Sequence, residues 1–284
     1  MKIDREYLLN VVSCALAEDI GDGDITTAVS VDASVSAVGK ITARKPLIVA
    51  GIPLVSAVFM QMDDALSVEV LIPDGSFACK NDIIAIVQGP AAPILTGERV
   101  ALNFIQRLSG IATITAEFVK RTEGTGVQIL DTRKTIPGWR LLEKYAVSMG
   151  GGTNHRFGLY DRFLFKDNHL AVGAPDLAKG IASIIKKARE YRPDCKVEVE
   201  VDTLEQLKKV LPSKPDIVLL DNFSLDDLRA AVSIAGESVF LEASGGVTLE
   251  TVRDIALTGV NGISVGALTH SAPAVDIALD LELC

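Results

Sequence analysis

The chain has 284 residues, 48% of them hydrophobic, which is enough to bury the core of one large domain or of two modest ones. Its formal net charge is -9 at pH 7 and it has no Lys/Arg-rich block, so a nucleic-acid-binding surface, which needs a broad basic face, is disfavoured. Its four cysteines lie far apart without a Cys-x-x-Cys pair, which argues against a zinc ribbon or a disulfide framework and favours a reducing cytoplasm.

The first hundred residues predict an α+β domain. Residues 7–18 have helical spacing, and Val- and Ile-rich stretches separated by turn residues predict strands within residues 35–50, 67–72 and 83–88. Residues 46–62 carry no charge, but Gly51 and Pro53 interrupt them, and they are fewer than the roughly 20 apolar residues of a membrane-spanning helix. This stretch therefore predicts a strand followed by a core helix, and no membrane segment is expected.

One alternative for this region is a binding module. Residues 75–89 faintly resemble half of a lipoyl or biotinyl carrier domain, in which a lysine is modified covalently. A carrier lysine stands at an exposed hairpin tip, whereas Lys80 precedes a predicted strand and no second half follows. Intact mass would reveal a modified Lys80.

Residues 93–121 predict one long helix or two consecutive helices, with Gly97 and Gly110 as possible interruptions. Arg99, Asn103 and Arg107 fall four residues apart on the side opposite the apolar positions. Taken alone, that spacing predicts a solvated face.

After Gly126 the pattern alternates between strand and helix. The predicted strands are residues 127–130, 163–165, 196–201, 216–220, 239–242 and 262–265. The predicted helices are residues 140–148, 175–191, 204–211, 225–235 and 249–257. This alternation indicates a parallel α/β structure, either an open doubly wound sheet or a barrel with fewer than the usual eight strands.

Polar residues follow nearly every predicted strand. They are Arg133 and Lys134, Lys166 and His169, Glu200 and Asp202, Asp221 and Asn222, Ser244 to Gly246, and Gly266 with His270. An open sheet concentrates its site at one switch point, whereas a barrel gathers residues from many strand ends. The distribution therefore favours a barrel.

These residue types predict a site for a polyanion and a metal ion. Arg133, Lys134, Arg156 and Lys166 can bind carboxylates or phosphates, and residues 131–169 contain seven Lys/Arg against four Asp/Glu. Glu200 and Asp221 are hard oxygen ligands suited to Mg²⁺ held with a phosphorylated substrate. Backbone N–H groups near Ser244, Gly245, Gly246 and Gly266 can bind phosphate. Each piece alone has a plainer interpretation, since Glu200 could face solvent and the glycine pair could form an ordinary turn.

Several long motifs support a more specific interpretation. They are Asp131-Thr-Arg-Lys-Thr-Ile-Pro-Gly138, Glu143-Lys-Tyr-Ala-Val147, Gly150-Gly-Gly-Thr-Asn-His-Arg156, Lys166-Asp-Asn-His169, Glu242-Ala-Ser-Gly-Gly246 and Ile263-Ser-Val-Gly-Ala-Leu-Thr-His270, together with Glu18-Asp-Ile-Gly21, Asp24-Ile-Thr26 and Arg107-Leu-Ser-Gly-Ile-Ala-Thr113. In this order they resemble the nicotinate-nucleotide pyrophosphorylase family, also called quinolinate phosphoribosyltransferase. The resemblance covers nearly the whole chain.

The resemblance implies an N-terminal α+β sandwich-like domain over residues 1–107, joined by the C-terminal tail 275–284, and an incomplete, about six-stranded α/β barrel over residues 108–274. It implies transfer of a phosphoribosyl group from phosphoribosyl pyrophosphate to the ring nitrogen of quinolinate, with loss of one carboxylate as CO₂. The products are nicotinate mononucleotide and pyrophosphate, in de novo NAD biosynthesis. Mg²⁺ is expected with the phosphoribosyl substrate, and no organic cofactor is required.

The family's site residues map onto this sequence one by one. The family's quinolinate-carboxylate cluster corresponds to Arg133, His155, Arg156 and Lys166. Its phosphoribosyl contact corresponds to Lys134, and its acidic pair near the ribose and Mg²⁺ corresponds to Glu200 and Asp221. Ser244, Gly245, Gly246, Gly266 and His270 match its phosphate end. Arg99 matches an arginine that family members lend to a neighbouring subunit, so the resemblance implies a homodimer or a higher homo-oligomer with shared sites.

Two further alternatives remain at this point. Related proteins associated with molybdenum transport keep the scaffold, but they tend to differ around the Asn-His-Arg and Lys-Asp-Asn-His segments, both of which this chain has in the quinolinate form. Lys166 at a strand end could instead form a Schiff base in an aldolase.

Overall fold

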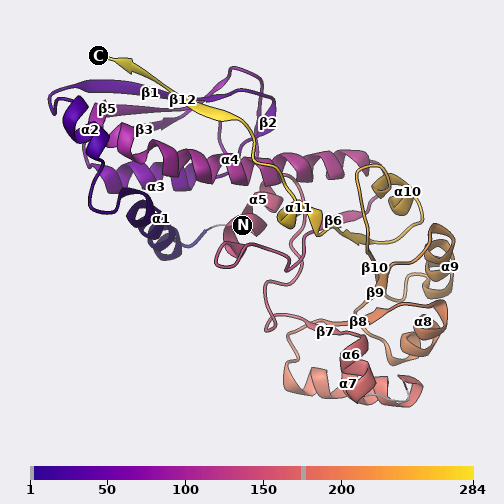
Figure 1. Cartoon of the computed structure of the whole chain (residues 1–284). Coiled ribbons are helices and arrows are strands. Elements are labelled where there is room, and N and C mark those ends of the chain that lie inside the picture. Colours follow the sequence, from indigo (N-terminus) through magenta and orange to yellow (C-terminus); the bar gives the residue numbers. More distant parts are fainter. Residues whose placement is uncertain (1–2, 174–176) are drawn as a thin grey trace. The chain divides into compact units, whose positions relative to one another are not determined.

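The computed structural model describes residues 3–173 and 177–284, which form two compact units. The first unit contains the residues up to 116, residues 141–151 and residues 271–284, and the second contains residues 117–140 and 152–270. Helix α4 (Ala91–Arg121) contributes residues to both units (Figure 1). The boundary predicted between residues 107 and 108 therefore falls inside a helix.

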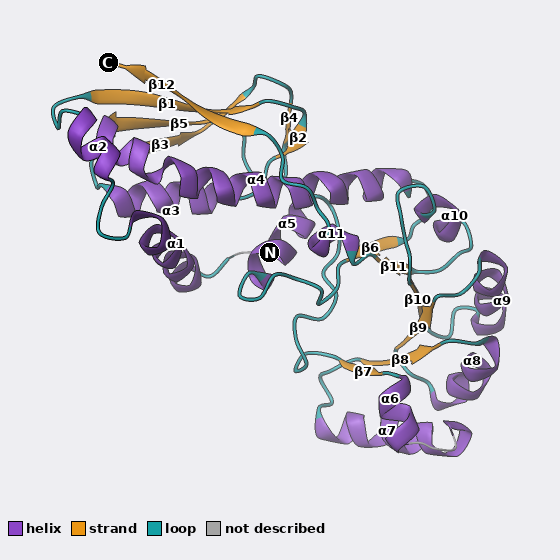
Figure 2. Cartoon of the chain, in the orientation of Figure 1, coloured by secondary structure: helices purple, strands orange, loops and turns teal. Residues whose placement is uncertain are grey.

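The first unit is an α+β structure built on an antiparallel sheet with the strand order β12-β1-β5-β3. These strands are β1 (Ser36–Ala43), β3 (Ser67–Val70), β5 (Ile83–Pro90) and β12 (Ile277–Leu283), and β2 (Leu47–Ile48) pairs separately with β4 (Phe77–Ala78). The helices are α1 (Arg5–Ile20), α2 (Ile25–Ser30), α3 (Ile52–Met62), most of α4 and nearly all of α5 (Arg140–Met149). Helices α3 and α4 lie along one face of the sheet (Figure 2).

Helix α4 is continuous, which settles the choice between one helix and two. Its two glycines permit close packing: a Cβ on Gly97 would lie 3.0 Å from Met62 Cγ, and one on Gly110 would lie 2.0 Å from the carbonyl oxygen of Pro273. The predicted solvated face of this helix is wrong at one position. Arg107 is half-buried and donates to the buried carboxylate of Glu143 at 2.7 Å, whereas Arg99 is exposed.

The second unit contains six parallel strands in the order β6-β11-β10-β9-β8-β7. They are β6 (Gln128–Leu130), β7 (Phe163–Phe165), β8 (Val197–Val201), β9 (Ile217–Asp221), β10 (Phe240–Ser244) and β11 (Gly262–Ser264). The first strand along the chain pairs with the last, and β6 and β7 form the two edges. The predicted incomplete six-stranded α/β barrel is confirmed.

Helices surround this sheet (Figure 2). They are α6 (Asp167–Gly173), α7 (Leu177–Tyr191), α8 (Leu204–Val210), α9 (Leu225–Ala235), α10 (Val252–Ala256) and α11 (Ala267–His270), with a 3-10 turn η1 at Leu211–Ser213. The sequence did not predict α6. Positions 175 and 176 of the predicted helix 175–191 lie outside the described residues. Within residues 3–173 and 177–284, none of the helices has the length and apolar character that crossing a membrane requires.

Candidate active site

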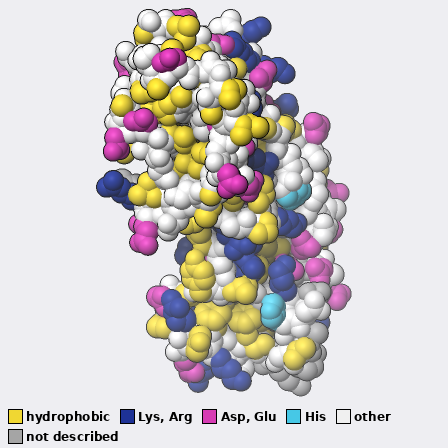
Figure 3. Space-filling view, turned by 60° about the vertical axis from the view of Figure 1, so that its left-hand side comes forward, with side chains coloured by type: hydrophobic (Ala, Val, Ile, Leu, Met, Phe, Trp, Pro, Cys, Tyr) yellow, Lys and Arg dark blue, Asp and Glu magenta, His cyan; other side chains and the backbone are white. Residues whose placement is uncertain are grey.

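The second unit has a cavity of about 460 Å³ among its strands and the loops that follow them. Eight residues predicted from the sequence line it: Arg133, Lys134, His155, Arg156, Lys166, Glu200, Asp221 and Ser244. Five lining residues were not predicted: Thr132, Leu164, Leu219, Glu242 and Ser264. Figure 3 shows several Lys and Arg side chains (dark blue) on the lower half of the visible face, with others at its upper right.

Strand register explains how distant residues meet here. In the parallel ladder Ser244 is paired with Asp221 on one side and with Ser264 on the other. Because side chains alternate along a strand, residues two apart point the same way, so Glu242 lies one layer deeper than Ser244. Glu198 lies one layer deeper than Glu200 for the same reason.

Asp131, at the end of β6, fixes the position of His155. It is fully buried and accepts hydrogen bonds from the backbone N–H of His155 at 2.8 Å and from Asn154 Nδ2 at 2.7 Å. The Nδ1 atom of His155 accepts the backbone N–H of Arg156 at 2.7 Å. The imidazole therefore presents Nε2 to the barrel interior.

Two arginines bring positive charge into the cavity. The Nε atom of Arg133 is buried and has no hydrogen-bond partner among the described residues, so it can donate to a bound anion. Arg156 is also buried, and its guanidinium donates to the backbone oxygen of Arg162 at 3.2 Å. Burial and the nearby charge of Arg133 lower the pKa of Arg156. An anion placed beside both arginines would relieve this repulsion.

An acidic pair lies on neighbouring strands. Glu200 on β8 is mostly buried and accepts a hydrogen bond from Lys166 Nζ at 2.8 Å, while Lys166 is about half exposed. Asp221 ends β9, is half-buried, and accepts from Asn222 Nδ2 at 2.7 Å. Both carboxylates line the cavity that the cations also line. Mg²⁺ bound together with a phosphorylated substrate is typically held by carboxylate oxygens beside the anion site, and this pair fits that pattern.

The residues predicted for the phosphate end lie at the ends of β10 and β11. Gly245 has φ +103°, and a Cβ there would lie 2.1 Å from Asn222 Oδ1, so only glycine fits. Gly246 also has a positive φ, of +58°. A Cβ on Gly266 would lie 3.1 Å from both the His270 ring and Lys134 Cδ, which places these three residues together. His270 is exposed.

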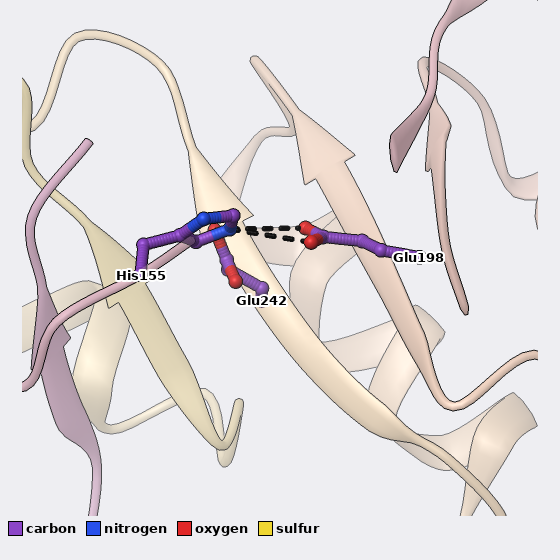
Figure 4. A group of neighbouring side chains, drawn as sticks. All are labelled: His155, Glu198 and Glu242. Atoms are coloured by element: carbon purple, nitrogen blue, oxygen red, sulfur yellow. Dashed lines mark hydrogen bonds and ion pairs between the residues drawn. The ribbon is translucent and has the colours of Figure 1, made fainter. Parts of the chain in front are cut away.

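A buried triad occupies the barrel interior (Figure 4). His155 Nε2 lies 3.2 Å from Glu198 Oε2 and 3.4 Å from Glu242 Oε1, and both glutamates are fully buried. Burial alone would lower the pKa of His155, but hydrogen bonds to the two carboxylates, and their charges, raise it to about 9.

Three such side chains can also hold a metal ion. Here, however, the Arg162 guanidinium lies 3.2 Å from both His155 Nε2 and Glu198 Oε2. Because that guanidinium already supplies the compensating positive charge, we assign no metal ion to the triad.

Arg99 is the one predicted site residue that lies in the first unit. It lines a separate hollow of about 320 Å³, together with Asp19, Asp24, Ile25 and Leu95. The structure therefore brings the other predicted residues together at the strand ends of the barrel unit, and Arg99 is not among the residues that line the barrel cavity.

Sequence reasoning missed the deeper layer of the site. Glu198, Glu242 and Ser264 lie within predicted strands, and their polar side chains face the barrel interior. The available signal was an acidic residue two positions before a rim residue, as in Glu198 before Glu200 and Glu242 before Ser244.

Comparison with known proteins places this site in a family. The model for the quinolinate phosphoribosyl transferase N-terminal domain matches residues 24–109, and that for the C-terminal domain matches residues 111–280. A probable nicotinate-nucleotide pyrophosphorylase (carboxylating) of Bacillus subtilis is 43% identical over 267 residues, covering 94% of this chain and 90% of the relative. A quinolinate phosphoribosyltransferase (decarboxylating) of Nicotiana glauca is 40% identical over 291 residues, covering 97% and 82%.

Solved structures agree. The nicotinate-nucleotide pyrophosphorylase of Francisella tularensis superposes with a TM-score of 0.93 at 41% identity, covering 99% of this chain and 98% of that one. Both halves of the chain match the family models, and the TM-score shows that the chain shares the fold of the solved structure. The chain belongs to the quinolinate phosphoribosyltransferase family.

Proposed function

We propose that this protein transfers the phosphoribosyl group of phosphoribosyl pyrophosphate to the ring nitrogen of quinolinate and releases one quinolinate carboxylate as CO₂. The products are nicotinate mononucleotide and pyrophosphate, a step of de novo NAD biosynthesis. The observation that carries the proposal is a single cavity, in a chain of this family, lined by Arg133, Arg156, Lys166 and an acidic pair.

Charge compensation explains the number of cations. Quinolinate is a dianion and its cosubstrate is more negative still, so bringing them together in a hollow costs Coulomb energy that rises as water leaves. Arg133, His155, Arg156 and Lys166 are assigned to the two carboxylates. The unpartnered Nε of Arg133 supports this assignment, because a bound carboxylate would supply its missing acceptor.

The phosphoribosyl side is assigned to Lys134, Ser244, Gly245, Gly246, Gly266 and His270. The left-handed backbone at Gly245 and Gly246, and the close approach of Lys134 to Gly266, support binding of phosphate by N–H groups and an ammonium. Lys134 and Lys166 act through charge and position. Lys166 forms an ion pair with Glu200 at 2.8 Å, which supports this role over Schiff-base chemistry.

Glu200 and Asp221 are assigned to Mg²⁺ bound with the pyrophosphate group, directly or through water. When bound, the ion neutralises charge that develops on the leaving pyrophosphate. The same two carboxylates stabilise the positive charge that develops on the ribosyl carbon as its bond to pyrophosphate breaks. After transfer the ring nitrogen is cationic, and it can hold the electron pair left by departing CO₂.

We assign Arg99 to the site of a second subunit in a homodimer or higher homo-oligomer. Ile25, which lines the same hollow as Arg99, is 83% exposed, and Val29, four residues further along α2, is 88% exposed; these apolar side chains support a subunit contact on this surface. Mixing Arg99→Ala subunits with Arg133→Ala subunits should restore part of the activity, because a mixed dimer then contains one intact site. No recovery from a verified mixed dimer would count against shared sites.

One assay tests the activity. Purified protein incubated with quinolinate, phosphoribosyl pyrophosphate and Mg²⁺ should form nicotinate mononucleotide, and Lys134→Ala should lose most of the turnover. Nicotinate in place of quinolinate should be a poor acceptor, because it leaves the ion pairs of one carboxylate empty. The family matches favour this activity over that of the molybdenum-transport relatives.

A cytoplasmic location stays a proposal, supported by four cysteines that are all free.

A further inference from the structure

Arg140 is a charged residue that the assignments above leave without a role. It is the first residue of α5, it is half-buried, and it is not among the residues that line the barrel cavity. Its guanidinium donates from Nε to Thr135 Oγ1 at 3.1 Å, from Nη2 to the backbone oxygen of Arg133 at 3.4 Å, and from Nη1 to the backbone oxygen of Phe157 at 3.0 Å. One side chain therefore joins the loop after β6 to the loop before β7.

These two loops carry cations of the proposed quinolinate site, with Arg133 on the first and Arg156 on the second. Residues 131–136 and 154–158 lie outside the helices and strands, so the hydrogen bonds of regular structure do not fix the distance between the two arginines. Burial lowers the pKa of Arg156, and the charge of Arg133 lowers it further, so the two guanidinium groups repel each other. A tie between the loops opposes that repulsion.

The chemistry of the Arg140 side chain suits it to setting a distance. A guanidinium is planar and its N–H groups point in fixed directions, so acceptors on two loops are held in one relative position. The second loop is braced at the same point, because the Phe157 N–H donates to Asp161 Oδ2 at 2.7 Å while its oxygen accepts from Arg140. The Arg156 guanidinium in turn donates to the backbone oxygen of Arg162 at 3.2 Å. The tie therefore reaches a segment in which Arg156 is itself oriented.

We propose that Arg140 is a positioning residue that sets the spacing between Arg133 and Arg156, and through that spacing the preference of the site for a ligand with two neighbouring carboxylates. The inference rests on the proposed function. A dicarboxylate that contacts both arginines depends on the distance between them, whereas a monocarboxylate can bind to one arginine wherever its loop lies. Two guanidinium groups held at a fixed spacing therefore distinguish quinolinate from a pyridine monocarboxylate such as nicotinate.

The phosphoribosyl side of the site has a separate tie. Lys134 lies on the same loop as Arg133, but its backbone N–H donates to Thr132 Oγ1 at 3.0 Å and its backbone oxygen accepts from Thr269 Oγ1 at 2.7 Å. Neither of these contacts involves Arg140. Loss of the Arg140 tie should therefore affect quinolinate and leave the KM for phosphoribosyl pyrophosphate little changed.

Binding measured without turnover tests the role. Calorimetric titration with quinolinate and, separately, with nicotinate gives both affinities in the absence of the phosphoribosyl substrate. Arg140→Lys keeps the charge but loses the planar fork, and it should weaken quinolinate binding about 10-fold, the equivalent of one lost charge-assisted hydrogen bond. Nicotinate binding should change little, so the ratio of the two affinities should fall by the same factor. Thr135→Val, which removes one acceptor of the tie, should lower that ratio less.

The matched control is Arg253→Lys. Arg253 also donates to two backbone oxygens, of Arg121 at 2.8 Å and of Glu123 at 3.2 Å, and it is not among the cavity-lining residues, so both affinities should stay at the wild-type value.

The proposal is overturned if Arg140→Lys binds quinolinate as tightly as the wild type. It is equally overturned if quinolinate and nicotinate weaken by the same factor, because that result means a general loss of structure. If Arg140→Lys does not fold, Thr135→Val decides, and an unchanged affinity ratio in that variant refutes the tie. If the wild-type protein does not bind quinolinate, the proposed function itself has failed.

Discussion

Asp131 offers a sharp test of how the site is held in place, because one buried carboxylate orients the segment that carries His155 and Arg156. Its two oxygens accept from the His155 backbone N–H at 2.8 Å and from Asn154 Nδ2 at 2.7 Å. In Asp131→Asn only one side-chain oxygen remains, and the new amide N–H faces a donor. Each hydrogen bond to a charged acceptor contributes about 1.5–3 kcal/mol, so we expect the free energy of unfolding to fall by about 2 kcal/mol or more.

The same variant should weaken quinolinate binding. A shift of residues 154–156 that removes one carboxylate contact raises the KM for quinolinate about 10-fold or more, since about 1.4 kcal/mol corresponds to a factor of ten. The KM for phosphoribosyl pyrophosphate should change little. Stability is measured by urea unfolding followed through the single tryptophan, Trp139, which lies in the barrel unit.

The control for this measurement is Asp226→Asn, the same change at an exposed aspartate, which should stay within about 0.5 kcal/mol of wild type. If Asp131→Asn unfolds at the wild-type urea concentration and keeps the wild-type KM for quinolinate, then Asp131 does not hold the anion-binding segment, and the reasoning above is refuted.

Two other variants probe the phosphate end and the buried triad. Gly245→Ala should lose more stability than Gly246→Ala, because both positions have a positive φ but only the first would place a Cβ 2.1 Å from Asn222 Oδ1; thermal melts that rank them equally would contradict the contact. The pKa of His155 is raised from 6.5 to about 9, so the stability it contributes is present in full below pH 6.5 and is lost as the pH rises through about 9. Glu198→Gln should lower the pKa of His155 toward its ordinary value. The difference in unfolding free energy between wild type and variant should therefore be larger at pH 6 than at pH 9.5. An equal difference at both pH values in urea titrations would show that the His155–Glu198 ion pair does not raise the pKa of His155.

The barrel and the residues at its strand ends could be predicted from the sequence because each parallel strand leaves two signals in it. Their apolar runs mark the strands, and the polar residue that follows each run marks the end where ligands bind. Lys166, Glu200 and Asp221 were found in this way, and all three line the cavity. Their residue types predicted an anion and Mg²⁺ site, but the substrate that each residue contacts came from the family motifs, because spacing alone cannot tell a carboxylate site from a phosphate site.

The deeper layer could not be predicted because it depends on tertiary packing. In a run such as Val197-Glu-Val-Glu-Val201, alternation shows that the glutamates share a face but not whether that face meets solvent or the barrel interior. Burial of Glu198 becomes favourable only with Arg162 and His155 beside it, and both come from other segments. Likewise, Gly110 interrupts a helix in isolation, yet here the chain near Pro273 packs against it.

Strand pairing has a consequence for synthesis on the ribosome. The last strands of the chain complete both sheets: β11 supplies the neighbour of β6, and β12 pairs with β1, with Ala37 opposite Leu283. Until those residues emerge, both β6 and one side of β1 expose unpaired backbone groups, which are templates for aggregation. A chain that lacks β11 and β12 would therefore expose two unpaired strand edges. We expect chaperones to bind this protein mainly until these two strands have been synthesised.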